Sequence, residues 1–286
     1  MEHPWIEETL QRSLGESLAH WRIELVKEID STSSELMRRG HQLDHQATVL
    51  IAQKQTAGRG RSGKPWLSPP RQSIAFSMAC TLEPLHWLGL SLACGVAVVK
   101  GLSAFLPPSL ACSPALSLKW PNDLWAWDER GPAKVGGLLI ETQSLRTAPD
   151  QKNTTLRSPA SQARFCVVGV GINLHTPNTE GLGVVCPPAK GLLDLGARLN
   201  SSDERHALLA SVLVSLSQAL HQFEASGFAP FKADFDRLDC LKGRQVQLSD
   251  ARRGRALGVN ECGELLLDID GVRQALQAGE ISIRPQ

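Results

Sequence analysis

Residues 55–66 gather the side chains best suited to chemistry on an anion. The stretch Gln55-Thr-Ala-Gly-Arg-Gly-Arg-Ser-Gly-Lys-Pro-Trp66 contains three glycines, three cations and a tryptophan. Glycine lets the backbone approach a ligand closely, so that consecutive N–H groups can point at one acceptor, and arginine adds a planar fork of donors that stays charged. This segment therefore predicts a loop that closes over an anionic group.

Two nucleotide-binding patterns overlap this loop, and both fail on their context. The pattern G-x-G-x-x-G covers residues 58–63, and G-x-x-x-x-G-K covers residues 58–64. A P-loop needs Ser or Thr after the lysine to hold Mg²⁺, where this chain has Pro65. Both motifs must also lead into a helix, which the prolines of residues 65–70 prevent. The anion must therefore be identified from the rest of the chain.

The composition indicates an enzyme-sized globular protein. The chain has 286 residues, of which 42% are hydrophobic, which is enough for a packed core. Thirty Lys and Arg against 29 Asp and Glu give a net charge of +1, so we expect neither a nucleic-acid partner nor a membrane partner. Any cationic function must be local.

Cysteines and termini favour a reducing compartment. Seven scattered cysteines without a C-x-x-C pair predict reduced thiols, not a disulfide frame or a zinc site. The first residues are acidic and lack the apolar stretch of a secretory signal. The longest uncharged apolar run, residues 87–99, is shorter than the roughly 20 residues of a membrane helix. We therefore expect a cytoplasmic protein.

Hydrophobic periodicity predicts an α+β domain with the loop held between strands. An amphipathic lead-in over residues 1–22 is too short for a separate helix-turn-helix domain. A polar stretch over 142–163 reads as a surface loop. Helices are expected over 85–105 and over 202–226, the second opened by the Ser201/Glu204 capping box and stopped by Gly227. Strands are expected over 25–29, 48–52, 73–79, 116–120, 133–141 and 165–174.

The chain changes character after Asp239. Short β-like runs separated by glycine turns predict a small closed or half-closed barrel of about fifty residues. We therefore expect two domains, residues 1–239 and 240–286. The predicted short strands are residues 245–248, 255–259, 264–269, 272–276 and 281–283.

Two polar turns follow predicted strands. Asp30-Ser-Thr-Ser33 leads into a short helix over 35–39, with a capping-box spacing from Thr32 to Glu35 and Gly40 as its stop. Its hydroxyls are either simple helix caps or ligand contacts. Pro121-Asn-Asp123 is a turn after the strand that ends at Trp120, and its acid is either a turn residue or a functional one.

Other chemically active side chains have simpler interpretations. His41 and His45 share a helical spacing but no third ligand is apparent, so no metal site of protein side chains is predicted. Trp125 and Trp127 are assigned to packing. Lys119 could be a solvated charge at a strand end.

Four motifs in order resemble biotin protein ligases, the biotin–[acetyl-CoA-carboxylase] ligase family. They are Gly58-Arg-Gly-Arg-Ser-Gly-Lys-Pro-Trp66, Lys119-Trp-Pro-Asn-Asp123, Lys134-Val-Gly-Gly-Leu-Leu-Ile-Glu141 and Gly169-Val-Gly-Ile-Asn173. Asp30-Ser-Thr-Ser33 is similar to the family's Asp-Ser-Thr-Asn motif. The resemblance spans about residues 25–284 and is to the short form without a DNA-binding domain. It implies a class II synthetase-like mixed sheet flanked by helices, followed by a small SH3-like barrel.

The resemblance implies a two-step reaction. Biotin and ATP, with Mg²⁺, would give biotinyl-5′-AMP and pyrophosphate, and biotin would then pass to a lysine of a biotin carboxyl carrier protein domain. The first step brings a carboxylate against a phosphate, so cations are needed near both. The second needs a neutral amine, for which Asp123 is our hypothesis as proton acceptor or orienting group.

Carried over by motif, the family's roles fall on three sets of residues. The catalytic set is Lys134, Arg59 and Asp123. The biotin set is Ser31, Thr32, Ser33, Gln55, Arg59, Gly60, Arg61, Lys134 and Gly137. The nucleotide set is Gly58, Arg61, Lys64, Trp66, Lys119, Asn122 and Asn173.

Some points stay open on the sequence. Where the family usually carries arginine, this chain has Ser62 and Lys64, and where it carries Asn, the chain has Ser33. A lipoate ligase or lipoyl transferase would share the fold, although the glycine–arginine loop and the Lys119–Asp123 motif favour biotin. A non-enzymatic biotin-sensing repressor is a second alternative, against which the short N-terminus argues. We expect a monomer or weak homodimer, and a loop that is mobile without ligand.

Overall fold

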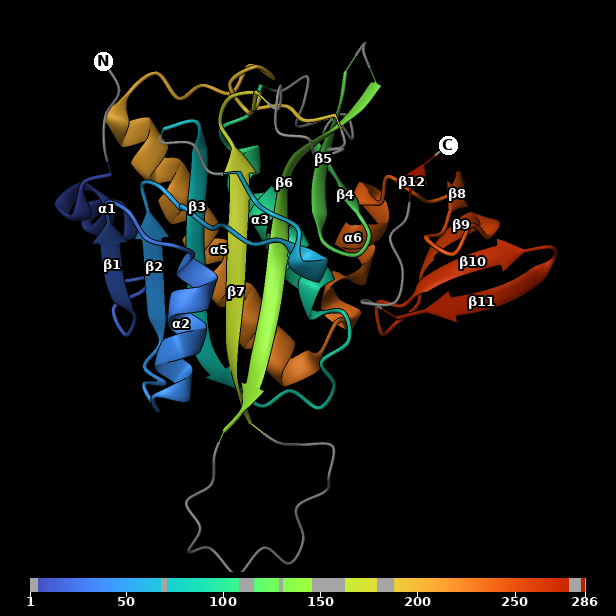
Figure 1. Ribbon diagram of the computed structural model, residues 1–286, viewed down its shortest axis with the longest axis horizontal. Coiled ribbons are helices and arrows are strands. Elements are labelled where there is room, and N and C mark those ends of the chain that lie inside the picture. The colour runs from blue at the N-terminus through green and yellow to red at the C-terminus, as the bar shows by residue number, and fades with distance from the viewer. Residues whose placement is uncertain are drawn as a thin grey trace, which may run out of the picture.

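A seven-stranded mixed sheet forms the centre of the protein (Figure 1). The computed structural model describes residues 5–67, 71–107, 116–128, 131–145, 163–178, 188–277 and 284–285. Strand order is β1-β2-β3-β7-β6-β5-β4, with β1 and β2 parallel and the other neighbours antiparallel. The strands are β1 (Arg22–Val26), β2 (Thr48–Ala52), β3 (Ser73–Leu82), β4 (Leu116–Lys119), β5 (Asp123–Asp128), β6 (Gly131–Ser144) and β7 (Arg164–Asn173).

Helices cover both faces of this sheet. One face carries α2 (Thr32–His41), and the other carries α1 (Glu7–Leu14), α3 (Leu90–Ser103) and α5 (Ser202–Ser226), with α6 (Lys232–Leu238) near β4 (Figure 1). Apolar residues surround α3 on all sides, so it lies buried between the sheet and α5. The capping box of Ser201 and Glu204 and the stop at Gly227 are confirmed on α5. The predicted mixed sheet with flanking helices is therefore confirmed.

Several predicted boundaries were wrong. The helix after Asp30 starts at Thr32, capped by the Ser31 hydroxyl, so Thr32 is not its cap. Gly40 lies inside that helix, where a Cβ would stand 2.5 Å from the Phe165 ring, so close packing on β7 accounts for the glycine. The first strand ends at Val26, although an isolated bridge joins Ile29 to Gln55.

Three more expectations are corrected, two of them by the antiparallel pairing of strands. Residues 142–144 belong to β6 because they pair with residues 164–166 of β7. Asp123 is the first residue of β5 and not only a turn residue, since it pairs with Lys119 and Gly137. The core helix begins at Leu90, after Gly89 at a φ of 83°. Most of the predicted surface loop, 146–162, lies outside the described residues.

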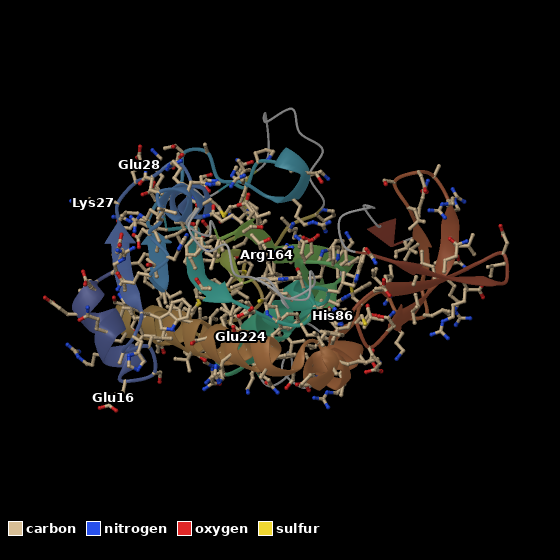
Figure 2. All side chains as sticks on the ribbon, turned by 90° about the horizontal axis from the view of Figure 1, so that it is seen from below. Glu16, Lys27, Glu28, His86, Arg164 and Glu224 are labelled. Atoms are coloured by element: carbon tan, nitrogen blue, oxygen red, sulfur yellow. The ribbon has the colours of Figure 1, made fainter. Side chains whose placement is uncertain are left out.

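A second, five-stranded antiparallel sheet lies at the opposite end of the molecule from α1 and from Lys27 and Glu28 (Figures 1 and 2). Its order is β11-β10-β9-β8-β12, consistent with an SH3-like unit. The predicted strand over 281–283 lies outside the described residues, and the boundary near Asp239 stays a prediction. The strands are β8 (Gln245–Gln247), β9 (Arg253–Val259), β10 (Leu265–Ile269), β11 (Val272–Leu276) and β12 (Arg284–Pro285).

The C-terminal sheet joins the central domain beside the Lys119–Asp123 motif. The buried Trp120 indole donates a hydrogen bond to the Gly263 carbonyl, 3.1 Å away. Asp239 forms an isolated bridge with Leu118 of β4. Within the described ranges, no helix is long and apolar enough to span a membrane. Five described cysteines are free thiols; Cys112 and Cys186 lie outside those ranges.

Candidate active site

The glycine–arginine loop crosses the α2 face of the sheet, in front of β7 and β6 (Figure 1). It closes on itself, because the Gly60 N–H donates to the Lys64 carbonyl at 2.7 Å and the Trp66 N–H donates to the Gly58 carbonyl at 2.8 Å. Between them lies the short 3-10 helix η1 (Arg61–Gly63). The loop thus folds as a compact turn that projects Arg59 and Arg61 toward β6 and the turn at Asn122.

Five neutral polar residues meet where α2, the loop and β3 converge, and we call them the hydroxyl–amide cluster: Ser31, Thr32, Ser33, Gln55 and Ser77. Gln55 Oε1 accepts from the Thr32 N–H at 2.8 Å and from its hydroxyl at 3.1 Å. Ser77 Oγ lies 2.8 Å from Thr32 Oγ1 and 2.9 Å from Ser33 Oγ. The three serines and Thr32 are buried. Four residues predicted from two separate motifs are therefore brought together.

An ion pair fixes the start of α2 from outside. The Asp30 carboxylate accepts from the Ser31 N–H at 2.7 Å and is held by both terminal nitrogens of Arg38, at 2.8 and 3.0 Å. The Arg38 guanidinium lowers the pKa of Asp30 to about 2. This fork therefore orients the turn that presents Ser31 and Thr32.

Four charged side chains and one amide gather at the other end, and we call this the charged cluster: Arg61, Lys119, Asn122, Asp123 and Lys134. Asp123 Oδ1 is 2.7 Å from Lys134 Nζ, and Oδ2 is 3.8 Å from Lys119 Nζ. Arg61 Nη1 donates to Asn122 Oδ1 at 3.1 Å, while Asn122 Nδ2 donates to the Leu138 carbonyl at 2.7 Å. Residues from the loop, from the β4–β5 turn and from β6 thus share one place.

Burial makes this charge costly. Desolvation lowers the pKa of Arg61, against the opposing attraction of Asp123, and it also lowers the pKa of Lys119, where Lys134 and Lys64 add repulsion. Three cations face one carboxylate within the cluster. An anionic ligand would relieve this surplus of positive charge.

Arg59 stands apart from the other loop cations. Its Nη2 is 2.7 Å from the Glu141 carboxylate, and its Nε donates to Ser34 Oγ at 2.8 Å. Its charge is already compensated by protein, so its catalytic role remains a prediction. Lys64 is exposed beside η1 and contributes repulsion at Lys119.

Glycines on β6 and β7 make room for side chains of this site. A Cβ at Gly171 would stand 2.3 Å from the Trp66 ring, and one at Gly169 would stand 2.2 Å from Ser33 Oγ. At Gly137 a Cβ would lie 3.2 Å from Lys134 Nζ. Trp66 therefore lies on the sheet, with its buried Nε1 lacking a partner and its ring 5.7 Å from Lys134 Nζ. Asn173, at the end of β7, is buried.

Two residues of this region were not found from the sequence. Ser77 is one more serine in an apolar strand, and nothing in the motifs marks it. Glu141 ends the quoted Lys134–Glu141 motif, yet only the fold shows its pairing with Arg59. The sequence offered no signal for Ser77, because the register that places it opposite Gly169 is set by the pairing of β3 with β7.

Comparisons with known proteins point to one family. The model of the biotin/lipoate A/B protein ligase family matches residues 25–152. The bifunctional ligase/repressor BirA of Escherichia coli (strain K12) is 32% identical over 261 residues, covering 90% of this chain and 72% of that protein. The biotin–[acetyl-CoA-carboxylase] ligase of Mycobacterium tuberculosis is 30% identical over 288 residues, covering 97% and 95%.

A solved structure gives the same result. The biotin protein ligase from Aquifex aeolicus in complex with biotin and ATP superimposes with a TM-score of 0.67 at 26% identity, covering 93% of this chain and 99% of that one. The protein is an α+β protein of the ligase class, with a seven-stranded and a five-stranded sheet. It belongs to the biotin/lipoate A/B protein ligase family.

Proposed function

We propose that this protein activates biotin with ATP to biotinyl-5′-AMP and transfers the biotinyl group to a lysine of a biotin carboxyl carrier protein domain. The observation that carries the proposal is the joint placement, on one sheet face, of a neutral hydroxyl–amide cluster and a charged cluster with surplus cations. Biotin has a neutral ureido ring at one end and a carboxylate at the other. The two clusters match these two ends.

The hydroxyl–amide cluster suits the ureido ring. That ring carries two N–H donors and one carbonyl acceptor, so its site must offer both kinds of group in a buried setting. Hydroxyls of Ser31 and Thr32 and the amide of Gln55 supply them. Ser33 and Gly60 complete the proposed biotin set, together with Arg59 and Arg61 toward the carboxylate and Gly137 beside β6.

The charged cluster suits the reacting groups. The biotin carboxylate oxygen must attack the α-phosphorus of ATP while pyrophosphate leaves, so two anions meet and negative charge accumulates. Lys134 is the proposed main stabiliser of that charge, with Arg61 beside it and Lys119 at phosphate oxygens. Asp123 Oδ1, 2.7 Å from Lys134 Nζ, orients the Lys134 ammonium. Gly58, Lys64, Trp66, Asn122 and Asn173 form the rest of the proposed nucleotide site.

In the transfer step, a carrier lysine amine attacks the acyl carbon and AMP leaves with the C–O bond electrons. The attacking nitrogen must give up its protons. Asp123 is the proposed group that orients the amine or accepts one of these protons. Asp123→Ala should then slow transfer from preformed adenylate about tenfold or more. Normal single-turnover transfer in that variant would refute this assignment, and Asp236→Ala, at another Lys–Asp pair of 2.7 Å, is the control.

Mg²⁺ is expected to enter with ATP. No three His, Cys, Asp or Glu side chains among the described residues are grouped to hold a metal ion. Asp123 is already paired with two lysines. We therefore expect the ion to be held mainly by phosphate oxygens, which is common for Mg²⁺ in ATP-dependent enzymes.

Incubation with labelled biotin, ATP and a carrier domain tests the proposal. We expect label on the carrier lysine and pyrophosphate release that depends on biotin. A parallel reaction with lipoate serves as the control, because a lipoate ligase would share the fold. No transfer, or transfer only of lipoate, would refute the biotin assignment.

A further inference from the structure

Ser77 lies at the centre of the hydroxyl–amide cluster, beneath the residues proposed to touch biotin. It is 0% exposed, and its Oγ lies within 2.9 Å of both Thr32 Oγ1 and Ser33 Oγ. Ser77 is therefore bonded to two residues of the proposed biotin set and can act on a ligand through them.

The Gln55 amide has one possible orientation. The Thr32 backbone N–H points at it from 2.8 Å. A backbone N–H can only donate, so the amide atom that faces it must be the carbonyl oxygen. The Gln55 Nε2 group therefore points the other way, toward the loop, where a Cβ at Gly58 would be 3.1 Å from it.

This orientation fixes the direction of three hydroxyl protons in the cluster, those of Thr32, Ser77 and Ser33. Gln55 Oε1 only accepts, so the single hydroxyl proton of Thr32 is donated to it, at 3.1 Å. Thr32 Oγ1 can then only accept from Ser77. Ser77, having used its proton, can only accept from Ser33. The order is Ser33 to Ser77 to Thr32 to Gln55.

We propose that Ser77 is a positioning residue for ligand selection: its donation to Thr32 leaves the Thr32 hydroxyl proton for Gln55 Oε1, and this second donor reinforces the Thr32 backbone N–H in holding the Gln55 N–H donors toward the loop and the proposed biotin site. The ligand atom at that place must then be an acceptor, as the ureido carbonyl oxygen is. A ligand with an N–H donor at that position would face the N–H donors of Gln55, so the site would reject it. This inference rests on the proposed function.

Steady-state pyrophosphate release with biotin and with 2-iminobiotin, which has an N–H donor in place of the ureido oxygen, tests the role of Ser77. Ser77→Ala should raise KM for biotin on the order of tenfold, with kcat little changed, and reduce the preference for biotin about fivefold or more. Ser77→Thr, which keeps the hydroxyl, should retain the wild-type preference. The thermal midpoint of each variant shows whether a change in KM reflects lost stability or lost positioning of Gln55.

Two further variants sharpen the test. Ser33→Ala removes only the first donor of the chain, and Ser33 belongs to the proposed biotin set, so this variant should raise KM for biotin but change the preference for biotin less than about twofold. Ser117→Ala, another buried serine of the same sheet, bonded to Trp125 and Trp127, should change neither.

Three results would overturn the proposal for Ser77. They are an unchanged preference for biotin over 2-iminobiotin in Ser77→Ala, an altered preference in Ser77→Thr, or a larger loss of preference in Ser33→Ala than in Ser77→Ala. A wild-type protein that releases no pyrophosphate with biotin would refute the proposed function instead. The two failures are therefore distinguishable.

Discussion

In the hydroxyl–amide cluster the Thr32, Ser33 and Ser77 hydroxyls already have hydrogen-bond partners, whereas the charged cluster holds three cations against the one carboxylate of Asp123. Neutral groups can be buried together at little cost once each is bonded. Buried cations of like sign repel, and burial lowers the pKa of Arg61 and Lys119. These hydroxyls have their hydrogen-bond partners before a ligand binds, whereas the positive charge of the charged cluster is not fully compensated.

This difference separates binding from chemistry. A preorganised neutral cluster contributes affinity and selectivity, because its contacts are the same in the ground state and the transition state. Cations with unrelieved repulsion gain most when negative charge accumulates on the reacting phosphate. Substitutions in the two clusters should therefore change different kinetic constants.

Lys134→Gln should produce the largest effect. Loss of the ammonium beside the reacting groups is expected to lower kcat for biotin-dependent pyrophosphate release by about 10²- to 10³-fold. Lys232→Gln is a matched control, since both lysines sit 2.7 Å from an aspartate with 23% of the side chain exposed. Equal effects in the two variants would contradict the assigned role of Lys134.

Arg61→Gln tests whether charge compensation decides which loop arginine matters. Within the described residues, the Arg61 side chain donates to the neutral amide oxygen of Asn122, whereas Arg59 is paired with the Glu141 carboxylate. We expect Arg61→Gln to raise KM for ATP about 10- to 100-fold and Arg59→Gln to raise it less than about fivefold. Initial rates measured over a range of ATP concentrations give KM for both variants. A larger rise in KM for Arg59→Gln than for Arg61→Gln would contradict the idea that charge compensation decides which arginine matters.

Thr32→Val should act on biotin affinity. The change keeps the shape of the side chain but removes the hydroxyl, so KM for biotin is expected to rise about tenfold with kcat reduced less than about threefold. Thr48→Val is the control, because Thr48 on β2 is buried like Thr32 and its hydroxyl donates to the Gln46 carbonyl, away from the cluster. A fall in kcat without a change in KM would show that the neutral end takes part in the chemistry.

Asp239→Asn should have the smallest effect on activity and a measurable one on stability. Burial raises the pKa of Asp239 to about 6, and its Oδ2 has no hydrogen-bond partner. Since the folded pKa lies above the unfolded value of 3.8, the group's stabilising contribution is full below pH 4 and is lost as the pH rises through 6. Asn carries no charge to desolvate.

The thermal midpoint of Asp239→Asn should therefore match that of the wild type near pH 4 and exceed it near pH 8, by the equivalent of about 1–3 kcal/mol in unfolding free energy. Scanning calorimetry across this range, with biotin-dependent activity at pH 8 as a second readout, checks both parts. A wild type that is the more stable of the two at pH 8 would show that the buried carboxylate is favourably paired.

The sequence by itself determined most of the elements and the residue types of the site. Periodicity and capping gave α5 to the residue, since Ser201, Glu204 and Gly227 act within one turn of the helix ends. The family motifs predicted Lys134, Asp123 and Arg61, which the fold brings together. Such signals depend on residues near one another along the chain, so they can be read without a structure.

Only the tertiary structure decided which side chains compensate one another. Arg59 and Glu141 are far apart in sequence, and Ser77 meets Thr32 because β3 lies beneath the start of α2. Strand register sets these pairings, and a shift of one residue would turn Ser77 to the opposite face. Hydrogen-bond direction also follows from geometry, because the orientation of Gln55 depends on one backbone N–H that no spacing rule predicts.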